Sequence, residues 1–307
     1  MLPTIKQLQY LVALADELHF GRAARACHVT QPALSDQIQC LEQLLGVQLF
    51  ERSRRRVLLT PAGRALSERA RRVLHELEDM TAMARSGGEP FATPMRLGVI
   101  PTVAPYLLPP LLAHLRREIP ALRLFLREEL TAPLTEKLAA GELDAALVAL
   151  PAGDDDALEG TPLFHDPFLL VAHRSHPLAR RRRLQMGDLT DGVLLLLEEG
   201  HCLRAQALEV CRLAGARDSA TFRASSLGTL VQMVANGIGI TLLPRLAVEV
   251  ELRGCDELTA VPFTDPAPRR TVGLVWRAGS ARREECLLLA EAIRRGLPAL
   301  GVETAEG

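Results

Sequence analysis

The stretch TQPALSDQIQCLEQLLG, residues 30–46, decides how the fold begins. Thr30 can cap a helix, Pro32 falls in the first turn, where its missing N–H costs nothing, and Gly46 can end the helix. Between these ends, leucine and isoleucine recur every three or four residues and form one narrow apolar stripe. The opposite face is polar and hardly basic. The stretch therefore predicts an amphipathic helix that turns amides and hydroxyls outward.

The residues around this helix predict a winged helix-turn-helix. Apolar residues at helical spacing predict two shorter helices before it, over residues 5–18 and 20–27. Such a pair places its second helix in the DNA major groove, and the basic turn at 51–59 would be a wing that grips phosphates. The alternative is a small helical subdomain with a solvated arginine face. The expected DNA contacts are Thr30, Gln31, Pro32, Ser35 and Gln39 on the helix, and Arg52, Arg54 and Arg55 in the wing.

The order of these residues favours the DNA-binding interpretation. The chain resembles the LysR-type transcriptional regulators, whose signature is matched here at Phe20, Ala23, Ala24, Gln31, Pro32, Ala33, Leu34, Ser35, Gln37, Ile38, Leu41, Glu42, Leu45, Gly46, Leu49, Phe50 and Arg52. The sequence departs from the family at Asp36 and Cys40, where many members carry arginine or lysine. Those two positions lack the positive charge through which many family members would contact a phosphate or a base.

A long helix follows the wing. Thr60 to Gly63 opens it, and apolar residues then alternate at spacings of four and three, as in a coiled-coil seam. The resemblance implies that this linker helix pairs two subunits on a two-fold DNA site; the alternative is a helix that packs on its own domain. Residues 86–90, SGGEP, predict a hinge. The seam residues are Leu66, Val73, Leu77 and Met80, with Ala70 and Ala84 between and beyond them.

After the hinge, apolar strands alternate with helices, which predicts a parallel α/β architecture. The strands are expected at 95–100, 122–126, 144–150, 168–172, 193–197, 239–243 and 271–276, and the helices at 106–117, 134–140, 203–214, 227–236 and 282–297. The resemblance implies two lobes joined by crossing strands, similar to periplasmic binding proteins. The predicted domains are a winged helix at 1–60, a linker helix at 61–88 and a two-lobed regulatory domain at 91–307.

Composition excludes several classes of protein. At 307 residues the chain is long enough for two or more domains, and 48% hydrophobic and 24% charged residues fit a globular protein. No run of about 18 apolar residues and no signal-peptide core occurs, so a cytoplasmic protein without membrane contact is expected. Residues 1–88 hold 12 Lys and Arg against 9 Asp and Glu, a balance that suits contact with a polyanion. The four arginines at 180–183 are expected to be solvated surface, with contact to DNA or polymerase as the alternative.

No nucleotide-binding, zinc-protease or serine-hydrolase motif appears, and the six cysteines have no zinc-ligand spacing, so no metal or cofactor is expected. The stretch GHCLR at 200–204 nevertheless points to redox chemistry. Cys202 stands at the predicted start of a helix, where N–H groups and the neighbouring His201 and Arg204 favour the reactive thiolate. Cys211 follows nine residues later, about 13.5 Å away along a continuous helix. A disulfide needs Cα atoms within about 7 Å, so bridging requires the segment to unwind. The alternative is a pair of inert buried thiols.

The stretches GHCLR, IPTVAPYLLP at 100–109, FRASSL at 222–227, GITLLP at 239–244 and PRRTVGLVWR at 268–277 are similar to the peroxide-sensing branch of the same family. This resemblance implies that Cys202 reacts with hydrogen peroxide, that Cys211 resolves the product to a disulfide, and that Thr102, His201 and Arg270 line the peroxide pocket. Whether Arg269 or Arg270 faces the pocket depends on the phase of the strand.

The expected function is therefore a peroxide-responsive transcriptional regulator, not an enzyme. Its expected partners are double-stranded DNA, further copies of itself in a dimer or tetramer, and RNA polymerase. Two alternatives remain: a LysR-type regulator that senses a metabolite between the lobes, and a thiol peroxidase.

Overall fold

A computed structural model describes residues 2–52, 56–86, 89–152, 157–189, 193–214, 217–302 and 304–305. These residues form two compact units, the first made of residues 1–89 with 139–142 and the second of residues 90–138 and 143–307. Each unit has its own hydrophobic core residues. Within the described residues, no helix is both long and apolar enough to cross a membrane.

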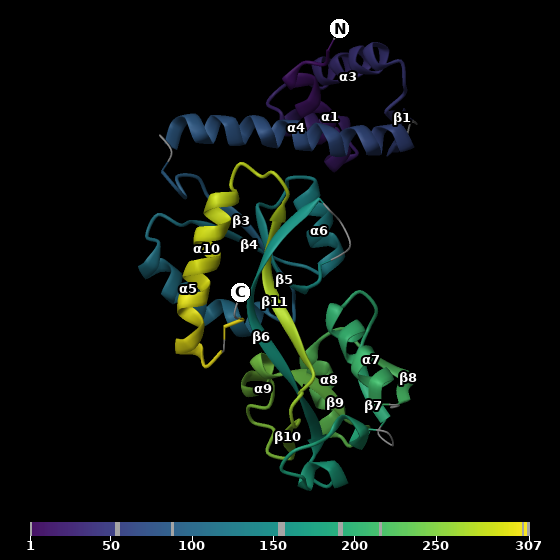
Figure 1. Ribbon diagram of the computed structural model, residues 1–307. Helices are drawn as coiled ribbons and strands as arrows, with labels where there is room; N and C mark the ends of the chain where they lie inside the picture. Colours follow the sequence, from purple (N-terminus) through teal and green to yellow (C-terminus); the bar gives the residue numbers. More distant parts are fainter. Residues whose placement is uncertain are drawn as a thin grey trace. The chain divides into compact units, whose positions relative to one another are not determined.

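The first unit is a three-helix cluster with a two-stranded wing and a long helix (Figure 1). Thr30 caps α3, with its Oγ1 accepting from the backbone N–H of Ala33, and Gly46 ends it in the left-handed conformation, as the sequence predicts. Leu34, Ile38 and Leu41 are buried in its core. The elements are α1 (Ile5–Glu17), α2 (Phe20–Ala26), α3 (Gln31–Leu45), β1 (Phe50–Arg52), β2 (Val57–Leu59) and α4 (Pro61–Ser86).

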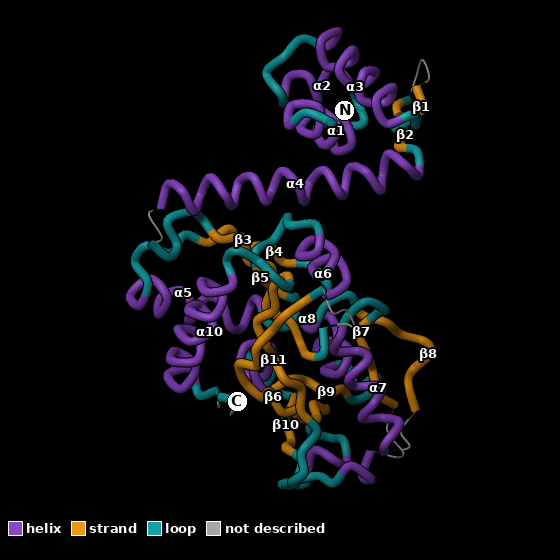
Figure 2. The backbone as a smooth tube through the Cα atoms, turned by 45° about the horizontal axis from the view of Figure 1, so that its top comes forward, coloured by secondary structure: helices purple, strands orange, loops and turns teal. Residues whose placement is uncertain are grey.

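The second unit contains two lobes. In the first lobe, β3 (Met95–Val99) pairs in parallel with β4 (Leu124–Glu128) and β5 (Ala145–Leu150), as the alternating pattern predicts. Three helices cover this sheet: α5 (Ala104–Glu118), α6 (Thr131–Ala139) and α10 (Arg283–Gly296). Figure 2 shows α5 and α10 running side by side.

In the second lobe, β7 (Val193–Leu197) and β8 (Arg217–Ala224) form a parallel pair. The remaining elements are α7 (Cys202–Ala214), α8 (Leu227–Ala235), β9 (Thr241–Pro244), α9 (Arg245–Glu251), β10 (Leu258–Pro262) and the short 3₁₀ helices η1 (Pro177–Arg180) and η2 (Met186–Leu189); η3 (Leu297–Leu300) follows α10. The sequence patterns missed β8, α9 and β10.

Two long antiparallel strands connect the lobes, as Figure 1 shows. β6 (Leu158–His173) pairs through its first half with β11 (Arg269–Arg277), and through its second half with β9 and β10. β11 in turn pairs with β5 of the first lobe. The crossing strands confirm the two-lobed architecture, and they bring residues from both lobes together at the point where β6 passes from one to the other.

Candidate functional site

Cys202 is the first residue of α7, as the sequence predicts. The chain reaches it from β7 through a turn at Gly200, whose φ of +97° is a conformation that glycine adopts without strain. The backbone N–H of Arg204 donates to the carbonyl oxygen of His201 at 3.0 Å, and its Nη1 donates to the carbonyl oxygen of Leu197 at 3.2 Å. These contacts fix the start of the helix that carries the thiol.

The Cys202 segment lies against the first lobe. The half-buried Cys202 side chain packs on the core cluster of that lobe, to which Ile100 and Val103 belong. A Cβ placed on Gly200 would stand 3.1 Å from Leu130 Cδ1, just before α6. The start of α7 and its thiol therefore lie against the core of the first lobe, at the junction between the lobes.

Arg270 is the inward-facing residue of the two arginines that begin β11. Its side chain is fully buried, whereas Arg269 is exposed. Arg270 Nη1 donates to Thr102 Oγ1 at 2.8 Å, and Nη2 donates to the carbonyl oxygen of Thr102 at 2.9 Å. Nε and Nη2 also donate to Asp166 Oδ2, at 3.0 Å and 2.9 Å. The structure thus joins Thr102 and Arg270 directly and adds Asp166, which sequence reasoning missed.

Within the part of the chain that the structure describes, this arrangement leaves two hydrogen-bond donors that a small ligand could use. A guanidinium has five N–H groups, and the hydrogen bonds above use the Nε proton, both Nη2 protons and one Nη1 proton. Because Thr102 Oγ1 accepts from Arg270, its own O–H remains available as a donor. The second Nη1 proton and the Thr102 hydroxyl can therefore bind an oxygen atom that gains negative charge.

His201, the third expected pocket residue, is buried and immediately precedes α7 in the chain. Burial lowers the pKa of His201, while the charge of Glu198 and a hydrogen bond to the backbone of Ser225 act in the opposite direction. Burial therefore favours the neutral imidazole at neutral pH, so His201 adds little positive charge beside Cys202. Its hydrogen bond is directed to Ser225, and the Thr102–Arg270 contact is made without it.

A hydrogen bond between Tyr106 and Glu251 also ties the lobes together, and sequence reasoning missed it. Tyr106 on α5 donates from its hydroxyl to Glu251 Oε1 on α9 at 2.6 Å. Burial raises the pKa of Tyr106 well above its ordinary value, and the carboxylate adds to the effect. The phenol therefore stays protonated as a donor. Tyr106 lies in the stretch IPTVAPYLLP, but its position alone carried no sign of a partner on α9.

The cysteines occupy different environments. The backbone of Cys211 lies in the same helix as Cys202, so the two residues stand in the continuous helix that the sequence predicts. Cys286 is buried, and burial raises its pKa to about 12, which makes it an unreactive thiol. Burial also raises the pKa of Cys27. Cys40 is exposed on α3, the helix expected to enter DNA.

The expected DNA-binding residues that the structure describes lie on α3 and at the end of β1. Gln31, Pro32 and Gln39 are exposed on α3, Ser35 is half-buried, and Thr30 is the helix cap. Arg52 is the last residue of β1, before the turn that the sequence predicts as a wing. Arg54 and Arg55 lie outside the described residues.

The expected seam on α4 divides into two parts. Leu66 packs on the core of the first unit together with the buried Ala70. Farther along, Val73 is 47% and Met80 is 65% exposed, and Leu77 is half-buried. The seam therefore packs on its own domain at its start and offers apolar side chains to solvent beyond it.

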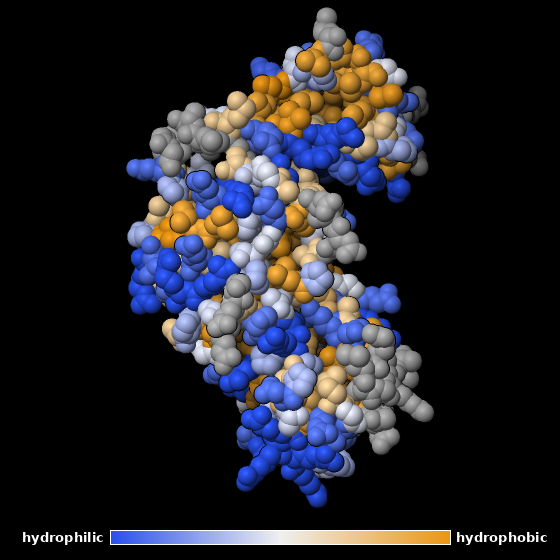
Figure 3. Space-filling model, in the orientation of Figure 1, coloured by the Kyte–Doolittle hydropathy of each residue, from blue (hydrophilic) through white to orange (hydrophobic). Residues whose placement is uncertain are grey.

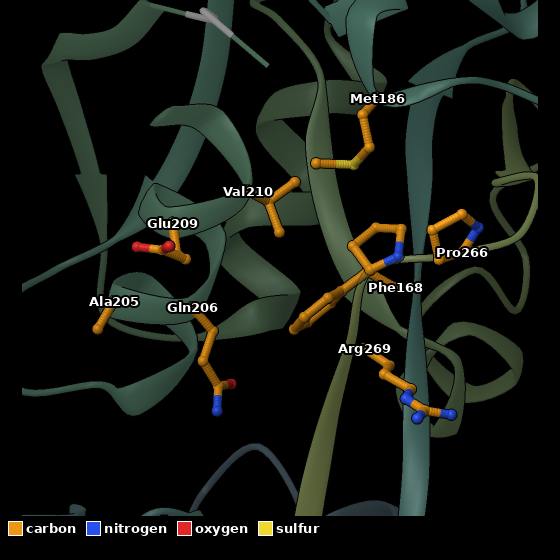
Figure 4. A pocket seen from close by; sticks show the side chains of 9 residues that line it. Phe168, Met186, Ala205, Gln206, Glu209, Val210, Pro266 and Arg269 are labelled. Atoms are coloured by element: carbon orange, nitrogen blue, oxygen red, sulfur yellow. The ribbon is translucent and has the colours of Figure 1, made fainter. Parts of the chain in front are cut away.

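A cavity of about 570 Å³ borders α7 on the second lobe. Ala205, Gln206, Glu209 and Val210 of α7 line it, and Figure 4 shows Phe168 of β6 opposite Val210, with Arg269 below and Met186 above. This cavity contains neither Cys202 nor Arg270 among its lining residues.

The arginine run of the second lobe is surface, as expected. Arg180 to Arg183 are all exposed, and Arg181 Nη1 lies 2.7 Å from Asp188 Oδ1. Figure 3 shows the lobe end that carries them as strongly hydrophilic.

Comparison with known proteins identifies the family. A model described as a bacterial regulatory helix-turn-helix protein of the lysR family matches residues 5–64, and the LysR substrate binding domain matches residues 88–298. The chain belongs to the LysR family. The DNA-binding transcriptional dual regulator OxyR of Escherichia coli K12 is 49% identical over 290 residues, which are 94% of each chain.

Two solved OxyR structures are similar to this chain along nearly their whole length. A full-length OxyR variant from Pseudomonas aeruginosa has a TM-score of 0.79 at 39% identity and covers 96% of this chain and 95% of its own. A hydrogen-peroxide-bound OxyR mutant from Corynebacterium glutamicum has a TM-score of 0.68 at 36% identity, covering 98% of this chain and 94% of its own. The family resemblance and the fold class predicted from the sequence are confirmed.

Proposed function

We propose that this chain is a peroxide-responsive transcriptional regulator. The observation that carries the proposal is a helix-initiating thiol, Cys202, packed on the core of the first lobe, in a chain where Arg270 of β11 binds the hydroxyl and backbone of Thr102 in that same lobe. Relatives named for hydrogen peroxide or OxyR support it, among them the peroxide-bound structure. Thr102, His201 and Arg270 are the pocket residues of this proposal.

The first step is attack of the Cys202 thiolate on one peroxide oxygen. The S–O bond forms as the O–O bond breaks, the sulfur is oxidised to sulfenic acid, and the other oxygen leaves as hydroxide. The Thr102 hydroxyl and the remaining Nη1 proton of Arg270 are placed to donate to the leaving oxygen. Cys211 then attacks the sulfenic sulfur, which forms the disulfide and releases water.

The second step requires a rearrangement of α7. Nine residues of continuous helix separate the two cysteines by about 13.5 Å, well beyond the roughly 7 Å that a disulfide tolerates between Cα atoms. The helix must therefore unwind before the bond closes. The rearranged segment would alter how regulatory domains pair, and through α4 the spacing of the winged helices on DNA.

The remaining parts of the proposal concern assembly. The winged helix of residues 1–60 would bind a two-fold promoter site through Thr30, Gln31, Pro32, Ser35 and Gln39, with Arg52, Arg54 and Arg55 on phosphates. Residues 61–88 would form the linker helix, pairing two subunits through Leu66, Val73, Leu77 and Met80, and residues 91–307 the redox-sensing domain. We further propose that the protein acts in the cytoplasm as a homodimer or homotetramer and contacts RNA polymerase.

A thiol peroxidase and a metabolite-sensing regulator are the competing functions. The proposed regulator consumes peroxide slowly, one molecule each time its disulfide has been reduced, because the oxidised form is its signal. A steady-state assay with thioredoxin or glutathione separates it from a peroxidase, which would turn peroxide over continuously. Peroxide titration of the thiols separates it from a metabolite sensor, whose cysteines would stay reduced.

The direct test is footprinting of the reduced and oxidised protein on the promoter of a neighbouring gene. The wild-type footprint should change with peroxide, and a Cys202→Ser protein should keep its DNA binding but show one unchanging footprint. A Cys286→Ser protein is the matched control, because its thiol is buried and unreactive. A wild-type footprint that ignores peroxide would refute the proposal.

A further inference from the structure

We propose that Asp166 is the positioning residue of the peroxide site: its carboxylate fixes the guanidinium of Arg270 so that Nη1 serves Thr102 and the reacting peroxide. The proposal rests on the function proposed above. Asp166 would act on the reaction through Arg270, without touching the peroxide itself.

The geometry holds both side chains in one arrangement. Asp166 on β6 and Arg270 on β11 are directly opposite each other in the antiparallel pair. Their side chains are 2% and 0% exposed, and Nη2 lies 2.9 Å from Oδ2. The other carboxylate oxygen, Oδ1, accepts from the backbone N–H of Leu246 at 3.1 Å. Because α9 begins at Arg245, Asp166 is anchored to the second lobe while it holds Arg270.

This anchoring decides which donors of Arg270 remain for the site. Oδ2 takes Nε and one proton of Nη2, so the edge of the guanidinium that faces Asp166 is fully used. The opposite corner, Nη1, then points to Thr102 and keeps one proton. A guanidinium without the carboxylate could rotate about its side-chain torsions and lose this direction.

The carboxylate also determines what kind of help Arg270 gives. A carboxylate and a guanidinium in contact cancel much of each other's charge at a distance. Arg270 therefore acts on the reaction chiefly through a directed hydrogen bond to the leaving oxygen. Such a hydrogen bond assists the breaking of the O–O bond. It has no counterpart in the reaction of the same thiolate with iodoacetamide, in which iodide is the leaving group.

Replacement by asparagine breaks this arrangement with little change in size. An asparagine side chain presents an oxygen on one side and an NH₂ group on the other. Both partners of Asp166, the guanidinium and the Leu246 N–H, are donors. One of them must therefore face the NH₂ group. Asp166→Asn should misdirect Arg270 or release α9 while leaving Cys202 in place.

The experiment compares two reagents on the full-length reduced protein. The rate of Cys202 modification by hydrogen peroxide and by iodoacetamide is followed by mass spectrometry of its peptide. In Asp166→Asn we expect the ratio of the peroxide rate to the iodoacetamide rate to fall roughly tenfold to hundredfold, the range for the loss of one hydrogen bond to a charged group. The iodoacetamide rate should not fall. An unchanged ratio, or an equal fall in both rates, would overturn the proposal.

Two further variants keep the test decisive. Asp144→Asn is the matched control, since Asp144 is a buried carboxylate of the first lobe whose Oδ2 accepts from Arg282 Nη1 at 3.0 Å, and it should leave the ratio unchanged. Asp166→Glu retains the charge but displaces it by one methylene, and it too should lower the ratio. This variant replaces Asp166→Asn in the test if the asparagine variant does not fold.

A double-mutant cycle shows whether Asp166 acts through Arg270. In an Arg270→Lys background, which has lost the guanidinium fork, Asp166→Asn should change the ratio by less than about twofold. Independent, multiplying effects would contradict the positioning role. If the wild-type Cys202 itself does not react with peroxide, the proposed function fails; if it reacts and the Asp166 variants keep the wild-type ratio, only the present inference fails.

Discussion

Weakening α7 should speed the closure of the disulfide. Ala205 is the exposed fourth residue of this helix and lies between the two cysteines. An alanine-to-glycine change in a helix interior costs about 1 kcal/mol of helix stability. If the helix must unwind before Cys211 can reach Cys202, that cost lowers the barrier by up to the same amount. Ala205→Gly should therefore close the disulfide about fivefold faster, since 1 kcal/mol corresponds to a factor of about five.

The assay is rapid mixing with excess peroxide, so that sulfenic acid forms first, followed by acid quenching and alkylation of free thiols. Ala113→Gly is the control, because Ala113 is exposed on α5 and carries the same intrinsic cost in a helix that keeps its shape. The reduction potential of the disulfide should also become about 20 mV more negative in Ala205→Gly alone. A closure rate in Ala205→Gly equal to that of the wild type and of Ala113→Gly would refute the idea that α7 must open.

Three other predictions concern the lobe junction. Gly200→Ala should lower the Tm of the regulatory unit by about 5 °C, because alanine at this φ is strained and its Cβ would press on Leu130; an unchanged Tm would contradict the described turn. Tyr106→Phe should cost about 1 kcal/mol in urea unfolding, since the half-exposed Glu251 regains water. Burial lowers the pKa of His201 and so favours its neutral form in the folded protein. Stability is therefore lost as the pH falls below the ordinary histidine pKa of about 6.5. In His201→Gln the Tm should depend less on pH between about pH 7.5 and pH 5.

Local signals predicted the ends of several helices. The cap at Thr30 and the stop at Gly46 gave the ends of α3, and both are confirmed. Cys202 was expected at the start of a helix, where α7 does begin. These features depend on neighbouring residues along the chain, which the sequence displays directly.

Local sequence patterns did not predict contacts between distant residues. Asp166 and Arg270 are 104 residues apart in the chain and meet only because β6 and β11 pair. The burial that keeps His201 neutral likewise comes from packing. The strand β8 was missed because its sequence, RDSATFRA, is too polar to read as a buried strand.

The most direct test of the account is disulfide mapping of the full-length protein after a stoichiometric amount of hydrogen peroxide. Digestion under non-reducing conditions and mass spectrometry should identify one peptide pair, joined between Cys202 and Cys211, with the Cys286 thiol still free. Recovery of both peptides unlinked, with Cys202 still reduced, would contradict the account.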